Sequence, residues 1–263
     1  MSNNGYFVHF EVPNINSTGV DAEVYAIYTN KNSLSAKNIG SSSVYNSNYQ
    51  GVNGTFFGSS GLLGIAVQNG SPIGNNSSGS KNGSSTVNRT RGTLYCTTSG
   101  TIGVKRVVYA HDLTGNIADL KWAFGGLSLW LDESLSKSTY DSRLQNWEGS
   151  NGVGGINDKR PRTMLGYNSS NGDVVLAVAF DKNNTSSGIT FYDARYIMSG
   201  LGCDKGIHLD GGSSSSIRFI EDHQDMADEV RRYRASTAGQ QSMAVASNTN
   251  FRYSPSPIGI GLG

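Results

Sequence analysis

The stretch "KGIHLDGGSSSSIRF", residues 205–219, begins as an apolar strand and then passes through an aspartate, two glycines and four serines. Asp210 stands where that strand ends. Glycines at 211 and 212 let a ligand approach the backbone closely. The N–H groups of such a turn can form an anion-binding nest, and the serine hydroxyls can donate to phosphate oxygens. A plain turn capped by Asp210 is the alternative interpretation.

The segments around this stretch read mostly as strands. Residues 162–181 form two apolar runs around "SSNG", which is typical of a hairpin. Residues 189–202 carry apolar side chains at helical spacing and end at a glycine. We therefore predict an α+β fold, a mostly antiparallel sheet with one main helix packed on it, with residues 1–263 as a single domain. Residues 71–92 have almost no apolar side chain and are predicted to be an exposed loop.

Two polar stretches are harder to place. Residues 132–160 read as a long connection with one helical turn near 140–147. Residues 223–234 are polar and suit a helix.

Charge and hydropathy exclude several classes of protein. The formal net charge is +1, so no basic field points to nucleic acid. No apolar run approaches the roughly 18 residues that a membrane span needs. The first 14 residues lack the pattern of a signal peptide. We expect a chain that is cytoplasmic, that belongs to a larger assembly such as a viral particle, or that has lost a leader.

Several catalytic and metal-binding motifs are absent. The four serines are not part of a G-x-S-x-G nucleophile elbow, which argues against a serine hydrolase. No H-E-x-x-H motif, paired cysteines or calcium loop occurs. The sequence therefore predicts no cofactor and no metal ligands, although it leaves a divalent metal ion open.

Five motifs in order give the chain a family resemblance. They are "GVNGTFF" (51–57), "WAFGGLSLWLDE" (122–133), "RPRTMLGYNSSNGDVVLAVAFD" (160–181), "SGITFYDARYIMSGLGC" (187–203) and "GIHLDGGSSSS" (206–216). Together they resemble the phosphodiester glycosidase family, and the resemblance covers residues 49–246. Departures from the family pattern at Thr55, Leu127, Lys182 and Ser213 concern the rim of the implied site, so they bear on the substrate more than on the fold.

The resemblance implies a set of site residues. It places catalytic groups at Asp210, Arg162 and Asn53. His208 joins them because it lies two residues before Asp210 on the same strand face, with strand packing as its alternative role. The implied substrate-binding residues are Gly211, Gly212, Ser213, Ser214, Ser215, Phe57, Gly125, Gly126, Thr163 and Asp181.

The family reaction, hydrolysis of a sugar phosphodiester at the anomeric carbon, assigns roles to these groups. Arg162 and the turn at 211–215 suit the negative charge that grows on phosphate. Asp210 suits the sugar side, where it stabilises positive charge or activates water. Asn53 could hold a hydroxyl group or position water. A buried ion pair between Arg162 and Asp210 or Asp181 is the structural alternative.

We therefore expect an enzyme that hydrolyses a glycosyl phosphodiester or a related sugar-phosphate or nucleotide-sugar linkage. One alternative is a non-catalytic binder of a phosphorylated sugar or nucleotide-like small molecule. Another is a module of a viral particle that recognises a cell-wall glycopolymer. The predicted partners are accordingly a phosphorylated sugar, a nucleotide-like ligand or a glycopolymer, with neither nucleic acid nor membrane.

Overall fold

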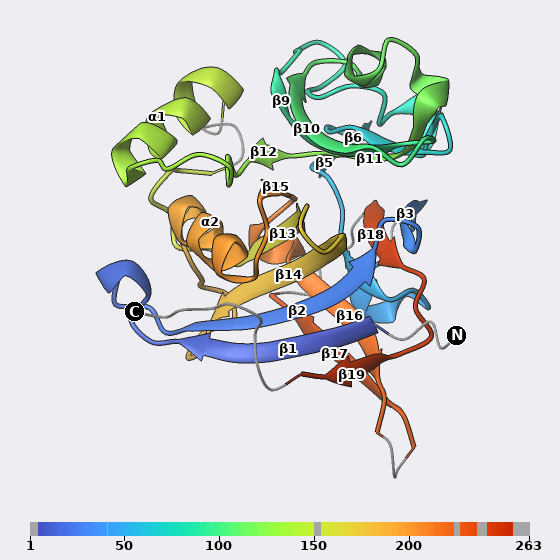
Figure 1. Cartoon of the computed structure of the whole chain (residues 1–263). Helices are drawn as coiled ribbons and strands as arrows, with labels where there is room; N and C mark the ends of the chain where they lie inside the picture. Colours follow the sequence, from blue (N-terminus) through green and yellow to red (C-terminus); the bar gives the residue numbers. More distant parts are fainter. Residues whose placement is uncertain (1–4, 41, 150–153, 224–226, 236–240, 255–263) are drawn as a thin grey trace.

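The computed structural model describes residues 5–40, 42–149, 154–223, 227–235 and 241–254. These residues are mostly β-structure: a large curled sheet, a smaller sheet and a two-stranded ribbon, with two α-helices (Figure 1). The predicted α+β fold, a mostly antiparallel sheet with one main helix, is therefore wrong. Among these residues, no helix has both the length and the apolar character needed to cross a membrane.

The large sheet has 12 strands and mixed pairing. Its order is β12-β15-β13-β14-β2-β1-β19-β16-β4-β18-β3, with β17 paired to β16. In chain order these strands are β1 (Gly5–Val12), β2 (Ala22–Asn30), β3 (Leu34–Asn38), β4 (Gly51–Asn53), β12 (Leu127–Ser128), β13 (Arg162–Tyr167), β14 (Asp173–Asp181), β15 (Lys205–His208), β16 (Ser216–Glu221), β17 (Glu229–Arg234), β18 (Ser242–Ala246) and β19 (Phe251–Tyr253). Strand β19 runs parallel to β1 and β16, so the sheet is not antiparallel throughout. Because β17 is a strand, the helix expected at 223–234 is also wrong for that segment.

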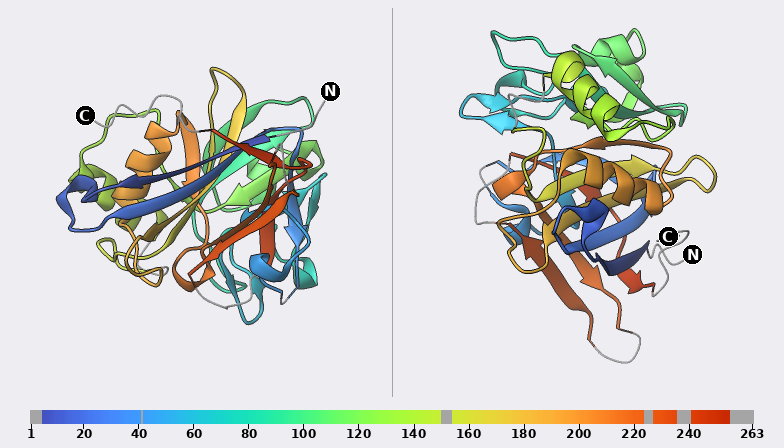
Figure 2. Two further views of the ribbon diagram at one scale, coloured as in Figure 1. Left: turned by 90° about the horizontal axis from the view of Figure 1, so that it is seen from below. Right: turned by 90° about the vertical axis from the view of Figure 1, so that its left-hand side faces the viewer.

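The smaller sheet lies over one side of the large one, as Figure 2 shows. Its five strands follow the order β10-β9-β11-β7-β8. They are β7 (Ala66–Gln68), β8 (Ser71–Pro72), β9 (Arg91–Thr97), β10 (Ile102–Val107) and β11 (Leu120–Gly125), and the ribbon is β5 (Phe57–Gly58) with β6 (Gly61–Leu62).

The segment 71–92 crosses the edge of the smaller sheet. Most of its residues are exposed or half-buried, whereas Asn82 is fully buried. The Asn82 amide accepts a hydrogen bond from the N–H of Ile65 at 3.1 Å and donates to the carbonyl of Val107 at 3.0 Å. These side-chain bonds add to the backbone hydrogen bonds that hold the segment to the sheet, such as that from the N–H of Asn82 to the carbonyl of Val108 at 2.8 Å.

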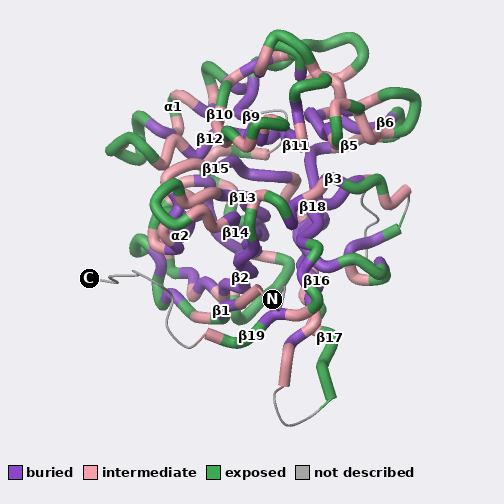
Figure 3. The backbone as a smooth tube through the Cα atoms, turned by 45° about the vertical axis from the view of Figure 1, so that its right-hand side comes forward, coloured by how far each residue is buried: buried purple, intermediate pink, exposed green. Residues whose placement is uncertain are grey.

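The apolar strand β14 shows why the core has two layers. Its side chains alternate between two faces, and both faces are apolar. Leu176 and Val178 point into the core that the large sheet shares with the smaller one, whereas Ala177 and Ala179 face helix α2. A strand buried on both faces lies at the centre of the fold, where Figure 3 shows the backbone as buried.

Helix α2 (Phe191–Gly200) covers that second face. It begins with a capping box, in which the Thr190 hydroxyl accepts from the backbone N–H of Asp193 and the Asp193 carboxylate accepts from the N–H of Thr190. Its buried side chains include Ala194, Ile197 and Met198. This element agrees closely with the helix predicted from the sequence.

Helix α1 (Lys137–Glu148) is longer than the single turn that the sequence suggested. The Ser136 hydroxyl caps its start, and Gly149 in the left-handed conformation (φ 65°) ends it. Only every fourth residue, Tyr140, Leu144 and Glu148, is buried. Because the last of these is a glutamate, the apolar period is too weak to reveal a three-turn helix.

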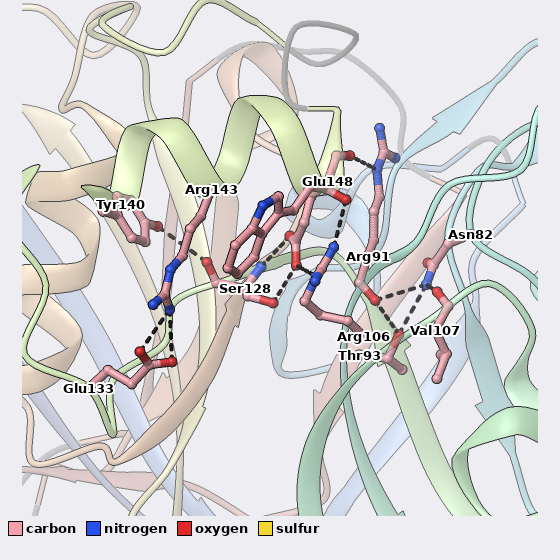
Figure 4. Close-up of polar contacts among 11 residues, drawn as sticks. Asn82, Arg91, Thr93, Arg106, Val107, Ser128, Glu133, Tyr140, Arg143 and Glu148 are labelled. Atoms are coloured by element: carbon pink, nitrogen blue, oxygen red, sulfur yellow. Dashed lines mark hydrogen bonds and ion pairs between the residues drawn. The ribbon is translucent and has the colours of Figure 1, made fainter. Parts of the chain in front are cut away.

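The buried Glu148 clamps α1 to both sheets (Figure 4). Its Oε1 accepts from Arg106 Nε of β10 at 3.1 Å and from Ser128 Oγ of β12 at 2.5 Å. Its Oε2 accepts from the backbone N–H of Ser128 at 2.7 Å. Arg91 of β9 donates to the Glu148 carbonyl at 3.3 Å. One carboxylate therefore joins the helix, the smaller sheet and the edge of the large sheet.

Candidate active site

The predicted site residues gather where strands β13 and β15 continue beyond their regular pairing. Met164 pairs with His208, and the N–H of Leu209 donates to the carbonyl of Thr163 at 2.9 Å. This antiparallel register places Asp210 opposite Arg162. The strand ends bring together two residues that lie 48 positions apart in the sequence.

Asn53, at the end of β4, is the hydrogen-bonding hub of this region. Its fully buried amide donates to the backbone carbonyl of Asp210 at 2.7 Å. Its Oδ1 accepts from Thr163 Oγ1 at 2.7 Å and from the N–H of Ser216 at 3.1 Å. Because both its oxygen and its nitrogen bond to protein groups, Asn53 helps to hold the backbone at Asp210 in place.

The Asp210 carboxyl group is half-buried and sits above the turn that follows it. Its Oδ1 accepts from the N–H of Gly211 at 3.1 Å, and the Ser214 side chain also hydrogen-bonds to it. Burial raises the pKa of Asp210 to about 7, against the lowering effect of these two hydrogen bonds. At neutral pH the group is therefore present in both protonation states.

Arg162 is a buried cation without a carboxylate partner among the residues that the structure describes. Its Nε donates to the carbonyl of Ile189 at 3.1 Å, and its Nη2 donates to the carbonyl of Asp158 at 2.8 Å. The guanidinium carbon lies 3.6 Å from the ring centre of Phe191. Burial lowers the pKa of Arg162 to about 10, so the group stays charged at neutral pH. The ion pair considered as its structural role is not formed.

The remaining nitrogen of this guanidinium faces the glycine turn. Arg162 Nη1 would lie 3.8 Å from a Cβ placed on Gly211. At Gly212, where φ is 61°, no described atom lies within 4 Å of such a Cβ. The side of the turn at Gly212 is therefore open, and a ligand there would come close to the backbone.

The turn itself does not present the predicted nest of N–H groups. It forms the short 3-10 helix η7 (Gly212–Ser214). The N–H of Gly212 donates to the carbonyl of Pro161 at 2.8 Å, and the N–H of Ser215 donates to the carbonyl of Gly212 at 3.1 Å. These donors are used within the protein, as is the N–H of Gly211. The positive charge available to an anion here comes from Arg162.

His208 lies beneath the site and not at its surface. Its Nε2 is 2.7 Å from the Tyr140 hydroxyl of α1, and its ring meets the edge of Phe191 with centroids 4.9 Å apart. Burial and the nearby Arg162 hold the pKa of His208 well below its usual range, so the ring is neutral. Its other nitrogen, Nδ1, has no partner among the described residues.

The two glycines at 125 and 126 serve close packing. A Cβ on Gly126 would lie 1.8 Å from the carbonyl oxygen of His208, and one on Gly125 would lie 2.1 Å from Asn82 Oδ1. No larger residue fits at either position without moving β15 or the buried Asn82. These glycines support the strand that carries the site.

Other predicted residues lie in local turns. Phe57 pairs with Leu62 in the β5–β6 ribbon. Asp181 ends β14, where its carboxylate accepts from the N–H of Asn183 at 2.9 Å. Ser213 is exposed, whereas Ser214 and Ser215 are buried in the turn. The Ser215 and Thr163 hydroxyl oxygens lie 3.2 Å apart, within hydrogen-bonding distance.

One group of possible metal ligands occurs in the described residues, away from this site. Glu221, His223 and Glu229 bring their ligand atoms within 4.8 Å of one another. Arg231 already pairs with both glutamates, at 2.5 and 3.2 Å, so one side-chain cation offsets part of the negative charge there.

Comparison with known proteins agrees with the motifs. The family model for phosphodiester glycosidases matches residues 46–247, and the chain therefore belongs to that family. A search of curated proteins found no match.

Among solved structures, 14 chains match. One is the catalytic domain of zebrafish N-acetylglucosamine-1-phosphodiester alpha-N-acetylglucosaminidase, auto-inhibited by its pro-peptide, with 13% identity and a TM-score of 0.63 over 92% of this chain and 82% of that one. Another is a hypothetical protein from Synechocystis, with 13% identity and a TM-score of 0.51 over 90% of this chain and 61% of that one. At these identities the likeness concerns the fold. The family predicted from the sequence is confirmed, as a hydrolase of the phosphodiester glycosidase kind.

Proposed function

We propose that the protein hydrolyses a glycosyl phosphodiester at the anomeric carbon, with Arg162 binding the phosphate and Asp210 acting on the attacking water. The observation that carries this proposal is that a guanidinium group and a carboxyl group lie opposite each other at the ends of two paired strands. A buried, charged guanidinium without a carboxylate partner in the described chain lies opposite a carboxyl group whose pKa is about 7. Family membership supports the reaction class.

The proposed chemistry follows from what each group can do. Water attacks the anomeric carbon, and the bond from that carbon to the phosphate oxygen breaks. The Asp210 carboxylate takes the proton of the water, and the phosphate leaves as a monoester whose added negative charge is stabilised by Arg162. Phosphate is a fair leaving group, so the scheme needs no strong general acid. The solved zebrafish relative is named for a sugar phosphodiester, which supports the same substrate class here.

The direct test is an assay for free sugar. The purified protein is incubated with a panel of glycosyl phosphodiesters and nucleotide sugars, alongside simple glycosides that lack phosphate. We expect release of reducing sugar together with a phosphate monoester or nucleotide, and no cleavage of the simple glycosides. A protein that binds these ligands and never cleaves them is a binding protein instead.

Replacing Arg162 with alanine should weaken binding throughout the reaction, because phosphate is charged in both the ground and transition states. Each charge-assisted hydrogen bond lost is worth about 1.5–3 kcal/mol, so KM should rise about 10- to 100-fold or more. Steady-state kinetics give KM, and competition by inorganic phosphate gives the affinity of the anion. The exposed Arg160, which pairs with Asp158, is the matched control: its alanine variant should leave KM almost unchanged.

The rate should depend on pH through Asp210. General-base catalysis needs the carboxylate form, and the pKa of this group is about 7. We expect kcat/KM to fall about tenfold for each pH unit below that value and to level off above it. A pH profile from 5 to 9 measures this. A rate that instead falls as the pH rises through 7 would make Asp210 the general acid.

A further inference from the structure

Three arginines gather on one face of the β16–β17 hairpin. Arg218 pairs directly with Arg232, and Ser216 pairs with Arg234. Cross-strand partners and residues two positions apart share a face of a sheet, so all three guanidinium groups lie on the same side. Two of them flank Tyr45, with Arg232 at 5.4 Å and Arg234 at 4.0 Å from its ring centre. We call Arg218, Arg232, Arg234 and Tyr45 the Arg–Tyr patch.

The positive charge of the Arg–Tyr patch is not balanced. Like charges placed directly opposite each other in a sheet are destabilising. In the part of the chain that the structure describes, none of the three arginines forms an ion pair. On the other face of the same strand, by contrast, Arg231 pairs with Glu221 and Glu229. On one face of β17 the arginine is therefore paired with carboxylates, whereas on the other face the arginines are not.

Arg218 gives the patch a buried, unsatisfied donor. The residue is only 7% exposed, and its Nη1 donates to the carbonyl of Tyr49 at 3.0 Å. Its Nε has no partner among the described residues. Burial and the nearby Arg232 lower the pKa of Arg218, which reports the same repulsion. A buried donor without an acceptor costs about 1–3 kcal/mol, so Arg218 adds unbalanced positive charge directly opposite the exposed Arg232.

The patch begins beside the candidate active site. The N–H of Ser216 donates to Asn53 Oδ1, and Ser216 pairs on its other side with Arg234. Asn53, Ser216 and Arg234 therefore form one row across β4, β16 and β17. Two strand spacings separate the ends of the row, which is roughly 10 Å. The row starts at Asn53, whose amide holds the backbone carbonyl of Asp210, so the patch and the candidate site share neighbouring strands.

We propose that the Arg–Tyr patch binds a second phosphate of a polyanionic glycan whose reacting phosphodiester lies at Arg162 and Asp210. The inference rests on the proposed function and narrows its substrate to a chain of sugars in which phosphodiester groups recur. Arginine forks match phosphate oxygens with paired hydrogen bonds, and three such groups without carboxylates favour an anion over a neutral sugar.

The test compares a substrate that has one glycosyl phosphodiester with a substrate that has several. The double variant Arg232→Gln/Arg234→Gln is assayed on a single glycosyl phosphodiester and on an oligosaccharide with several phosphodiester links. We expect KM for the oligosaccharide to rise about tenfold or more, with kcat unchanged and with single-repeat kinetics unchanged. The matched control is Arg231→Gln, the same charge change on the opposite face of β17, which should leave both substrates unaffected.

Two results would overturn the inference. Either the oligosaccharide is turned over equally well by wild type and double variant, or both substrates lose activity together. The single variant Arg232→Gln, which changes an exposed side chain, keeps the comparison valid if the double variant fails to fold.

Direct binding separates this inference from the proposed reaction. If the wild type cleaves neither substrate, the proposed function fails, and calorimetric titration with the intact oligosaccharide still tests the patch. Weaker binding by the double variant and not by Arg231→Gln then supports the patch. A single-stranded DNA oligonucleotide of equal charge is titrated in parallel, and binding of the DNA as tight as that of the glycan overturns the assignment to a glycan.

Discussion

The Asp210→Asn variant is expected to lose turnover by on the order of 10²–10⁴-fold while it keeps its affinity for substrate. The amide preserves the shape of the side chain and can still accept from the N–H of Gly211, but it cannot take a proton from water. The proposed phosphate contact at Arg162 is not altered by the substitution. Single-turnover kinetics and equilibrium titration measure the two quantities separately.

The same variant should not be destabilised at neutral pH. The pKa of Asp210 is about 7 in the folded protein, above its ordinary value of 3.8. This carboxyl group therefore favours folding when protonated, and that contribution is lost as the pH rises through 7. Because asparagine does not ionise, the melting temperature of the variant relative to wild type should increase between pH 4 and pH 8.

A suitable control lies at the other end of the same strand. Asp204 precedes β15, where it accepts a hydrogen bond from the N–H of Ser169 at 3.2 Å. Asp204→Asn should retain full turnover. An Asp210→Asn protein that melts earlier but turns over normally would show that Asp210 has only a structural role.

Replacing Glu148 with alanine is expected to cause the largest loss of stability. The change leaves the backbone N–H and the hydroxyl of the buried Ser128 without their acceptor, and it removes the carboxylate partner of the half-buried Arg106. Each buried donor left without an acceptor costs about 1–3 kcal/mol, so the total loss should be about 3–5 kcal/mol. For a chain of this size each kcal/mol shifts the melting temperature by about 2–4 °C, so a fall on the order of 10 °C should appear in thermal denaturation.

The control for Glu148 is a glutamate in an exposed pair. Glu133 accepts two hydrogen bonds from Arg143 of α1, both at 2.8 Å, and its side chain is 42% exposed. Surface pairs of this kind contribute about 0–1 kcal/mol, so Glu133→Ala should melt within a few degrees of wild type. Equal losses in the two variants would mean that the buried clamp adds nothing.

The parts of the fold that the sequence predicted well are those with local signals. Helix α2 has a capping residue at Thr190, an apolar face and a glycine near its end. The hairpin of β13 and β14 has two apolar runs and a turn between them. In each case the residues that decide the element lie within it.

The fold class could not be predicted, because it depends on partners distant in the sequence. The parallel pairing of β19 with β1 joins strands from opposite ends of the sequence. Strands β11 and β12 follow each other directly around Gly126 but belong to different sheets. No periodicity in the sequence indicates that the chain changes sheets there. The clamp at Glu148 depends on Arg106 and Ser128, and nothing in the polar sequence of α1 indicates those contacts.

The sequence motifs predicted that Asn53, Arg162 and Asp210 lie close together, and the structure places them on neighbouring strand ends. The conformation of the turn at 211–215 decides where its N–H groups point, and residue types alone do not determine that conformation. His208 shared a strand face with Asp210, as expected, but the cover from Phe191 and Tyr140 comes from two helices. The catalytic and binding roles stay predictions.

The Asn53 hub also has a consequence for how the chain folds. Its three hydrogen bonds reach residues 157, 110 and 163 positions away in the sequence. Contacts between such distant residues form slowly, because long loops must close before any of them is made. No early, locally formed intermediate can contain this amide in its final environment. The site can therefore form only after β4, β13 and β16 have come together, so ligand binding should report on this long-range pairing.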